Sequence, residues 1–155
     1  MHENLGIFSD AQEISADDTE STNYIDLGVT KPQIGVGQHA PWLCIKTNTA
    51  PTQAGDTLSI ELQNDADDAF SDPTVVMMPL VGENGAEISA ADARLATAGA
   101  WIFRGQLPYE VDERYLRLMY RNTTSTGVFT IDAWLEDGPP SDFGVQVLTS
   151  PVGNP

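Results

Sequence analysis

Apolar and polar residues alternate along several short segments of the chain, which is the pattern of a β-strand with one buried face. The clearest segments carry apolar residues at every second position: Leu58, Ile60 and Leu62; Leu116, Leu118 and Tyr120; Phe129, Ile131, Ala133 and Leu135. Further strand candidates are residues 8–14, 22–27, 42–48, 74–80, 100–105 and 143–149. Turn-forming residues separate them, as in 82–85 and 137–140, so the pattern predicts a chain of short strands.

Many short strands in a chain of 155 residues predict one all-β domain, an antiparallel β-sandwich of the jelly-roll type. We expect this domain to span residues 1–155, with a mobile N-terminal arm over about 1–8 and a mobile tail over about 150–155. Residues 89–98 are the only helix candidate, with Ser89 as its cap and Asp92 three positions later. The alternative for this segment is an alanine-rich loop across one end of the sandwich.

The chain is strongly acidic, with 23 Asp and Glu residues against 7 Lys and Arg and a formal net charge of −16. Nucleic-acid binding needs basic groups that displace counterions from phosphates, so this charge argues against DNA, RNA or an anionic membrane as a partner. The first residues show neither the basic nor the apolar region of a secretory signal. The longest apolar run, 75–81, is far shorter than the ~20 residues that span a bilayer.

Candidate catalytic and metal-binding residues are few. The two histidines, His2 and His39, are far apart in the sequence, and the single cysteine, Cys44, lies in an apolar stretch that predicts a small buried residue. The acidic segment 64–72 is the best metal candidate, but it lacks the calcium-loop pattern and is better interpreted as a solvated loop. We therefore expect no enzymatic activity, no cofactor and no metal.

Three tryptophans, Trp42, Trp101 and Trp134, suggest either a sugar-binding platform or the packing of a core or subunit interface. Trp134 alternates with Phe129 and Ile131 and therefore shares the polar face of its strand with Thr130 and Asp132. This makes Trp134 the tryptophan that we expect to be exposed, where it serves equally well as an interface anchor or a sugar platform.

Three stretches resemble a known family. They are Leu5-Gly6-Ile7-Phe8-Ser9-Asp10-Ala11-Gln12 with Ser21-Thr22-Asn23-Tyr24-Ile25-Asp26-Leu27-Gly28, then Leu58-Ser59-Ile60-Glu61-Leu62-Gln63-Asn64-Asp65 continuing to Ala69-Phe70-Ser71, and Glu113-Arg114-Tyr115-Leu116-Arg117-Leu118-Met119-Tyr120. In this order and spacing they resemble the jelly-roll capsid cement, or decoration, proteins of short-tailed bacteriophages. The resemblance runs from residue 5 to about residue 135, and the segment from Pro139 to Pro155 has no counterpart in it.

The resemblance implies a structural virion protein that is made in the host cytoplasm and binds the outer surface of an icosahedral head. There it would bridge neighbouring major capsid proteins of the HK97 fold and stabilise the shell. Such proteins are homo-oligomers, so a homodimer or homotrimer is expected. The family has no catalytic residues to transfer.

Apolar residues in the N-terminal arm, Leu5, Ile7 and Phe8, together with Trp134, are the predicted capsid or subunit contacts. The loop from Gly28 to Pro41 is a further contact candidate. The alternative function is a non-catalytic carbohydrate-binding or adhesin-type sandwich, which a row of exposed tryptophans would favour. A small barrel enzyme such as a cupin ranks last, because it needs clustered histidines that this chain does not have.

Overall fold

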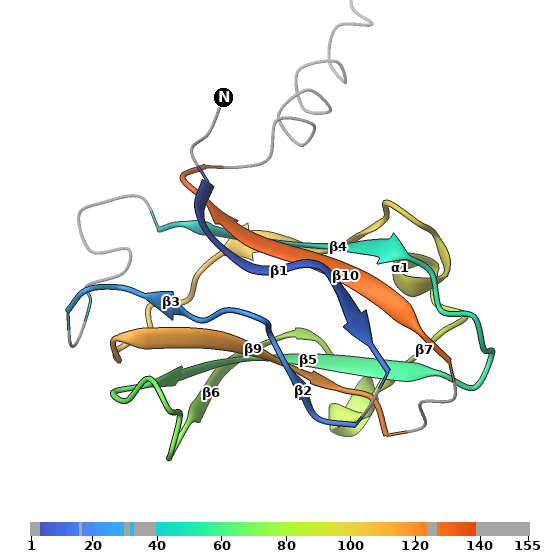
Figure 1. Cartoon of the computed structure of the whole chain (residues 1–155), viewed down its shortest axis with the longest axis horizontal. Coiled ribbons are helices and arrows are strands. Elements are labelled where there is room, and N and C mark those ends of the chain that lie inside the picture. The colour runs from blue at the N-terminus through green and yellow to red at the C-terminus, as the bar shows by residue number, and fades with distance from the viewer. Residues whose placement is uncertain (1–3, 16, 30–31, 33–39, 124–126, 139–155) are drawn as a thin grey trace, which may run out of the picture.

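The chain folds into two antiparallel β-sheets that pack face to face (Figure 1). The computed structural model describes residues 4–15, 17–29, 32, 40–123 and 127–138, with side chains from Gly6 onward. One sheet has four strands in the order β1-β10-β4-β8: β1 (Asn4–Ile14), β10 (Phe129–Glu136), β4 (Trp42–Thr49) and β8 (Trp101–Gln106). The other contains β2 (Thr19–Glu20), β9 (Tyr115–Arg121), β5 (Thr57–Asp65) and β6 (Thr74–Leu80), with the short strands β3 (Ile25–Asp26) and β7 (Ile88–Ser89) at its sides.

The order of the strands is that of a jelly roll. The chain enters the four-stranded sheet at β1, crosses to the other sheet at β2 and β3, and returns at β4. It then crosses again for β5 and β6, returns for β8, and ends with β9 and β10 in opposite sheets. Apart from the consecutive pair β5 and β6, strands adjacent in each sheet are therefore distant in sequence, and the predicted all-β jelly-roll sandwich is confirmed.

The core lies between the two sheets and is made by the alternating apolar residues. In β10 every second residue is buried, and Phe129, Ile131, Ala133 and Leu135 are at most 1% exposed. In β5 and β9, Leu58, Ile60, Leu62, Leu116, Leu118 and Tyr120 are each 0% exposed. These two sets face each other across the sandwich, so burial of apolar surface from both sheets is the main stabilising contribution.

Most strand predictions are confirmed, with boundaries moved by a few residues. The segment 22–27 is shorter than predicted, since it contains only β3 next to β2. The predicted strand 143–149 and the predicted tail over 150–155 lie outside the described residues. Of the predicted N-terminal arm, residues 1–3 lie outside the described residues, whereas β1 begins at Asn4 and pairs with β10 from there on. What fixes residues 4–8 is the backbone ladder to β10, which the sequence pattern does not show.

The helix candidate is reduced to one turn. Helix α1 (Ala93–Ala96) has four residues, and its cap is Asp92, not Ser89. The Asp92 carboxylate accepts a hydrogen bond from the Arg94 backbone N–H and two more from the Arg94 guanidinium, at 2.9 and 3.0 Å. Ser89 ends the short strand β7 instead, so the segment is mostly loop, as the alternative prediction had it.

We expect the Asp92→Asn variant to be less stable than the wild type by about 0.5 kcal/mol at pH 7, as for a partly exposed ion pair. The Arg94 side chain and then the Arg94 backbone N–H lower the pKa of Asp92 from 3.8 to about 2. A lowered pKa in the folded state contributes stability above pH 4 that is lost as the pH falls towards 2. Urea unfolding at pH 7 and at pH 2.5 should therefore show a clearly smaller difference between the two proteins at the lower pH.

The matched control for this measurement is Asp137→Asn, since Asp137 is exposed and makes no ion pair among the described residues. Its stability should follow the wild type at both pH values. A difference between wild type and Asp92→Asn that persists unchanged at pH 2.5 would contradict the role of the Asp92 charge.

Candidate functional site

The outward face of the four-stranded sheet carries the most unusual group of side chains in the described part of the chain. In β10 the residues between the core positions, Asp132 and Trp134 among them, point away from the core and are half-buried. Trp134 stands opposite Ile7 of β1 on one side and opposite Cys44 of β4 on the other. Cys44 in turn stands opposite Arg104 of β8, so this row crosses all four strands.

Two tryptophans from different strands meet on this face. The ring of Trp101, at the start of β8, lies 5.8 Å from the ring of Trp134, and the two planes are tilted by 43°. The Nζ atom of Lys46 lies 4.1 Å from the centre of the Trp101 ring, and the Cζ atom of Arg104 lies 5.3 Å from it. These distances are those of cation–π contacts. Trp101, Trp134, Lys46 and Arg104 are hereafter called the tryptophan cluster.

An open pocket of about 230 Å³ lies beside the tryptophan cluster. It is lined by Ile7, Ser9, Asp10, Asp132 and Trp134, and is hereafter called the acidic pocket. Three of these residues come from β1 and two from β10, so the pocket lies along the junction of these two strands. It therefore combines apolar side chains with two carboxylates.

Irregular pairing between β1 and β10 shapes the acidic pocket. β1 advances five residues, from Ile7 to Gln12, while β10 covers only the three positions between Trp134 and Ile131. The extra residues form a bulge, in which Ala11 adopts a positive φ of 46°. Bulges redirect side chains, and here Asp10 is placed at the pocket although it belongs to the strand that contributes Phe8 to the core.

Asp132 is held in place by hydrogen bonds to both of its oxygens. The backbone N–H of Ala11 donates to Oδ1 at 2.6 Å, and the Asn48 side chain of β4 donates to Oδ2 at 2.9 Å. The first of these bonds stabilises the β1 bulge. The carboxylate is thus fixed in orientation at the pocket, whereas Asp10 is exposed.

Ser9 connects the floor of the acidic pocket to the other sheet. Its side chain donates to Gln12 Oε1 at 2.5 Å and lies 2.7 Å from the Tyr120 hydroxyl of β9. Since the Ser9 hydrogen is given to Gln12, the Tyr120 hydroxyl acts as the donor to Ser9. Burial of Tyr120 raises its pKa above the usual value, so the hydroxyl keeps its proton. Ser9 therefore bonds the lining of the pocket through the core to the six-stranded sheet.

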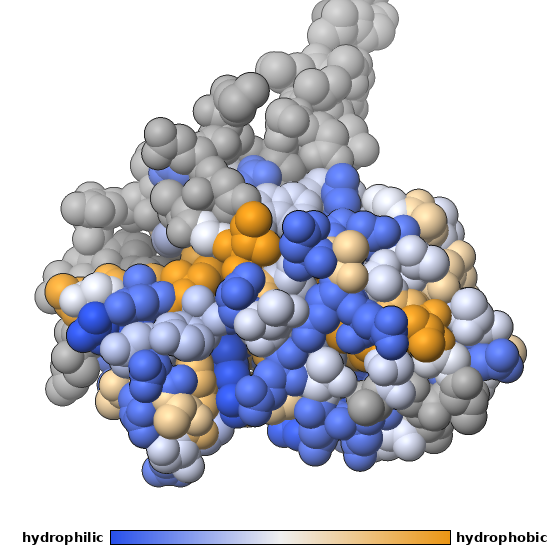
Figure 2. Space-filling view, viewed as in Figure 1, coloured by the Kyte–Doolittle hydropathy of each residue, from blue (hydrophilic) through white to orange (hydrophobic). Residues whose placement is uncertain are grey.

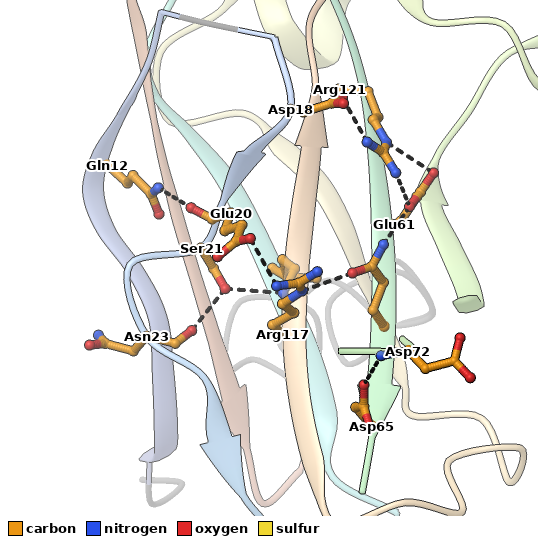
Figure 3. Close-up of polar contacts among 12 residues, drawn as sticks. Gln12, Asp18, Glu20, Ser21, Asn23, Glu61, Asp65, Asp72, Arg117 and Arg121 are labelled. Atoms are coloured by element: carbon orange, nitrogen blue, oxygen red, sulfur yellow. Dashed lines mark hydrogen bonds and ion pairs between the residues drawn. The ribbon is translucent and has the colours of Figure 1, made fainter. Parts of the chain in front are cut away.

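The outward face of the six-stranded sheet is different, because its charges are paired with one another (Figure 3). Arg121 of β9 bonds to Glu61 of β5 at 3.2 Å and to Asp18 at 2.7 Å. Arg117, also of β9, bonds to Glu20 of β2 at 3.0 Å and donates to Gln63 of β5 at 2.8 Å. These contacts attach β2 to its sheet, and we interpret them as structural.

The acidic segment 64–72 also uses its charges for its own loop. Asp65 accepts hydrogen bonds from the backbone N–H groups of Asp67 and Asp72, and Asp67 accepts from Ala69 and Ser71. Such bonds are typical of a loop that replaces missing strand pairing with carboxylate acceptors. Within the described residues no group of three or more His, Cys, Asp or Glu side chains is arranged to hold a metal ion.

The structure brings together two of the four predicted contact residues. Ile7 is 43% exposed and stands beside Trp134, and both line the acidic pocket. The prediction that Phe8 is a contact residue is wrong, because its side chain is 0% exposed and belongs to the core. The reason is the alternation along β1, which turns Phe8 inward when Ile7 faces outward. The side chain of Leu5, both histidines and most of the loop from Gly28 to Pro41 lie outside the described residues.

The prediction that Trp134 lies on the outward face of its strand is confirmed. Three other features of the site were not predicted. Trp134 is half-buried rather than fully exposed, because Trp101 packs against it. The contacts of Trp101 with Lys46 and Arg104 depend on strand pairing, and the place of Asp10 depends on the bulge. For Asp132 a signal existed, since it alternates in phase with Trp134. The prediction that Cys44 is buried is confirmed, at 0% exposed.

The chain matches a known protein family over most of its length. A protein-family model described as Bbp16 matches residues 8–134 of the chain. The match runs from the first core residue of β1 to Trp134 in β10, so it includes both sheets and most of the site. No curated protein matches the chain significantly. Among the described residues there is no helix with the length and apolar character needed to cross a membrane.

Proposed function

Because the chain belongs to the phage-related Bbp16 family, we propose that it is a capsid cement protein that binds the outside of an icosahedral phage head. In this proposal the subunit bridges neighbouring major capsid proteins of the HK97 fold and stabilises the shell. It acts through binding alone, as a homodimer or homotrimer, without catalysis and without contact to nucleic acid or membrane.

The observation that carries the proposal is the tryptophan cluster on the outward face of the four-stranded sheet. Tryptophan and arginine are the side chains most enriched at the energetic centres of protein interfaces. Here Trp101, Trp134 and Arg104 lie together on the face of a rigid sheet, next to the exposed Ile7. A pre-formed surface of this kind loses little conformational entropy on binding, which suits a protein that must attach at many equivalent sites.

The charge distribution supports an exterior position. With a net charge of −16 the chain is repelled by packaged DNA, and the same charge keeps free subunits soluble before they assemble. Figure 2 shows hydrophilic residues over most of the visible face, with apolar residues in small separate areas. Modest affinity per subunit is sufficient, because several linked contacts in an oligomer add avidity.

The carbohydrate-binding alternative is less well supported by the geometry. A sugar platform is a flat, accessible aromatic surface on which a sugar ring stacks. The rings of Trp101 and Trp134 are instead tilted by 43°, and Lys46 and Arg104 lie against Trp101. Both features are expected of an interface anchor rather than of a stacking platform.

The test of the proposal is co-sedimentation of the purified protein with expanded, undecorated heads of the cognate phage. We expect saturable binding at a fixed number of copies per head. Because a protein that binds only the assembled shell stabilises it by mass action, the melting temperature of the heads should rise with the concentration of the protein. Binding without saturation, or heads that melt at the same temperature with and without the protein, would reject cement function.

A further inference from the structure

We propose that the acidic pocket receives a basic side chain, arginine or lysine, from the protein to which this chain binds. The inference rests on the proposed function, since it names the chemistry by which the partner is recognised. The charge of the pocket and its apolar wall support the assignment.

The charge of the pocket selects a cation. Asp10 and Asp132 contribute two formal negative charges to a space of about 230 Å³. The Asp132 side chain keeps its orientation, because the Ala11 backbone N–H and the Asn48 side chain each donate a hydrogen bond to one of its oxygens. Its oxygens each retain acceptor capacity after these single bonds, and the exposed Asp10 has acceptor capacity as well. A guanidinium or ammonium group therefore finds both charge complementarity and acceptors in this pocket.

The apolar part of the pocket fits the rest of such a side chain. Arginine and lysine carry an apolar stem of three or four methylene groups below the charged head. Ile7, which is 43% exposed, and Trp134 offer an apolar wall and an aromatic ring for that stem and head. An acidic side chain would be repelled from this pocket, and a purely apolar one would desolvate both carboxylates without supplying a countercharge.

The basic residues of this chain do not occupy the pocket within the described residues. Lys46 and Arg104 lie against Trp101, and Arg94, Arg114, Arg117 and Arg121 are paired with carboxylates elsewhere. The acidic pocket and the basic side of the tryptophan cluster are thus neighbours of opposite charge. A partner surface that matches both must present a basic residue to the pocket and an acidic or polar group to Lys46, which sets the orientation of docking.

The first experiment tests the chemistry of the pocket without any capsid. The indole N–H signal of Trp134, identified by its loss in Trp134→Phe, is followed by NMR during titration with N-acetyl-arginine amide. We expect a saturable shift that is at least several-fold weaker with N-acetyl-citrulline amide, the uncharged analogue of the same shape. The shift should also weaken in Asp10→Asn and be restored in Asp10→Glu, which keeps the charge.

Glu13→Gln is the matched control, because Glu13 is an exposed acid on the same strand but does not line the pocket. Its titration should follow the wild type. Equal shifts with the arginine and citrulline compounds would overturn the inference, as would a shift with N-acetylglucosamine and none with arginine. The second of these results would instead identify a glycan subsite.

The second experiment uses undecorated heads. Asp10→Asn should bind them on the order of 10-fold more weakly than the wild type at low salt, as found for close charge pairs at interfaces. The difference should shrink at 0.5 M NaCl, where charges are screened over a few ångströms. Full affinity of Asp10→Asn for heads that bind the wild type would overturn the inference and leave the proposed function intact. Failure of the wild type itself to bind would reject the proposed function, while the titration still decides the chemistry of the pocket.

Discussion

Ile131→Ala is expected to lower the free energy of unfolding by about 2–5 kcal/mol, the range for removing a large aliphatic side chain from a packed core. Ile131 lies in the middle of β10, is 0% exposed and belongs to the core cluster shared by both sheets. Its strand pairs on both sides, with β1 and with β4, so the backbone cannot shift easily to fill the cavity. Urea or thermal unfolding of the purified protein measures the effect.

Ile7→Ala is the matched control for this core substitution. Ile7 lies on the neighbouring strand β1, has the same side chain and is 43% exposed. Its replacement should change the free energy of unfolding by less than about 1 kcal/mol, as is usual for exposed sites. Similar losses for both variants would contradict the burial pattern on which the description of the sandwich depends.

The sandwich is predictable from the sequence because a strand with one buried face alternates apolar and polar residues. A strand with one wet face must alternate, and β10 does so over its whole length, which is why its core residues and the outward face of Trp134 could be identified. The alternation does not show, however, which strands pair with one another. β1 and β10 are neighbours although more than a hundred residues separate them, and nothing in either segment alone specifies the other.

The candidate site was predictable only where it depends on alternation. Ile7 and Trp134 were identified from their residue types and positions, but their meeting is a consequence of register. Phe8 was misassigned, because residues near a chain end were expected to stay unpaired and the alternation of β1 was not extended back to Asn4. The place of Asp10 depends on a bulge stabilised by Asp132, a contact between residues far apart in the sequence, which no local pattern indicates.

The two sheets use their polar side chains in different ways. On the six-stranded sheet, Arg117 and Arg121 are paired with carboxylates of the adjacent strands, so that face largely neutralises itself. On the four-stranded sheet, Lys46 and Arg104 lie against an aromatic ring and the Asp132 carboxylate is held by neutral donors. The charged side chains of the two sheets are therefore held by different kinds of contact. In the proposed function the outward face of the four-stranded sheet is the docking surface, so variants that test binding belong there.

Trp134→Ala is expected to weaken binding to undecorated heads by at least about 30-fold, which corresponds to the ~2 kcal/mol that defines an interface hot spot. Trp134 is the residue shared by the tryptophan cluster and the acidic pocket, so its removal affects both. The fold should be retained, because the side chain lies outside the core and the loss of stability should be smaller than for Ile131→Ala. Co-sedimentation over a range of protein concentrations gives the affinity, and circular dichroism checks the fold.

Trp134→Phe and Tyr109→Ala complete the test of this residue. Trp134→Phe keeps an aromatic wall but loses the indole N–H that donates to Glu136 at 2.7 Å, so its affinity should lie between those of the wild type and Trp134→Ala. Tyr109 is 79% exposed and lies outside both the cluster and the pocket, so Tyr109→Ala removes a comparable ring and should bind within about twofold of the wild type. Wild-type affinity of a folded Trp134→Ala would contradict the role of Trp134 as the anchor of the docking surface.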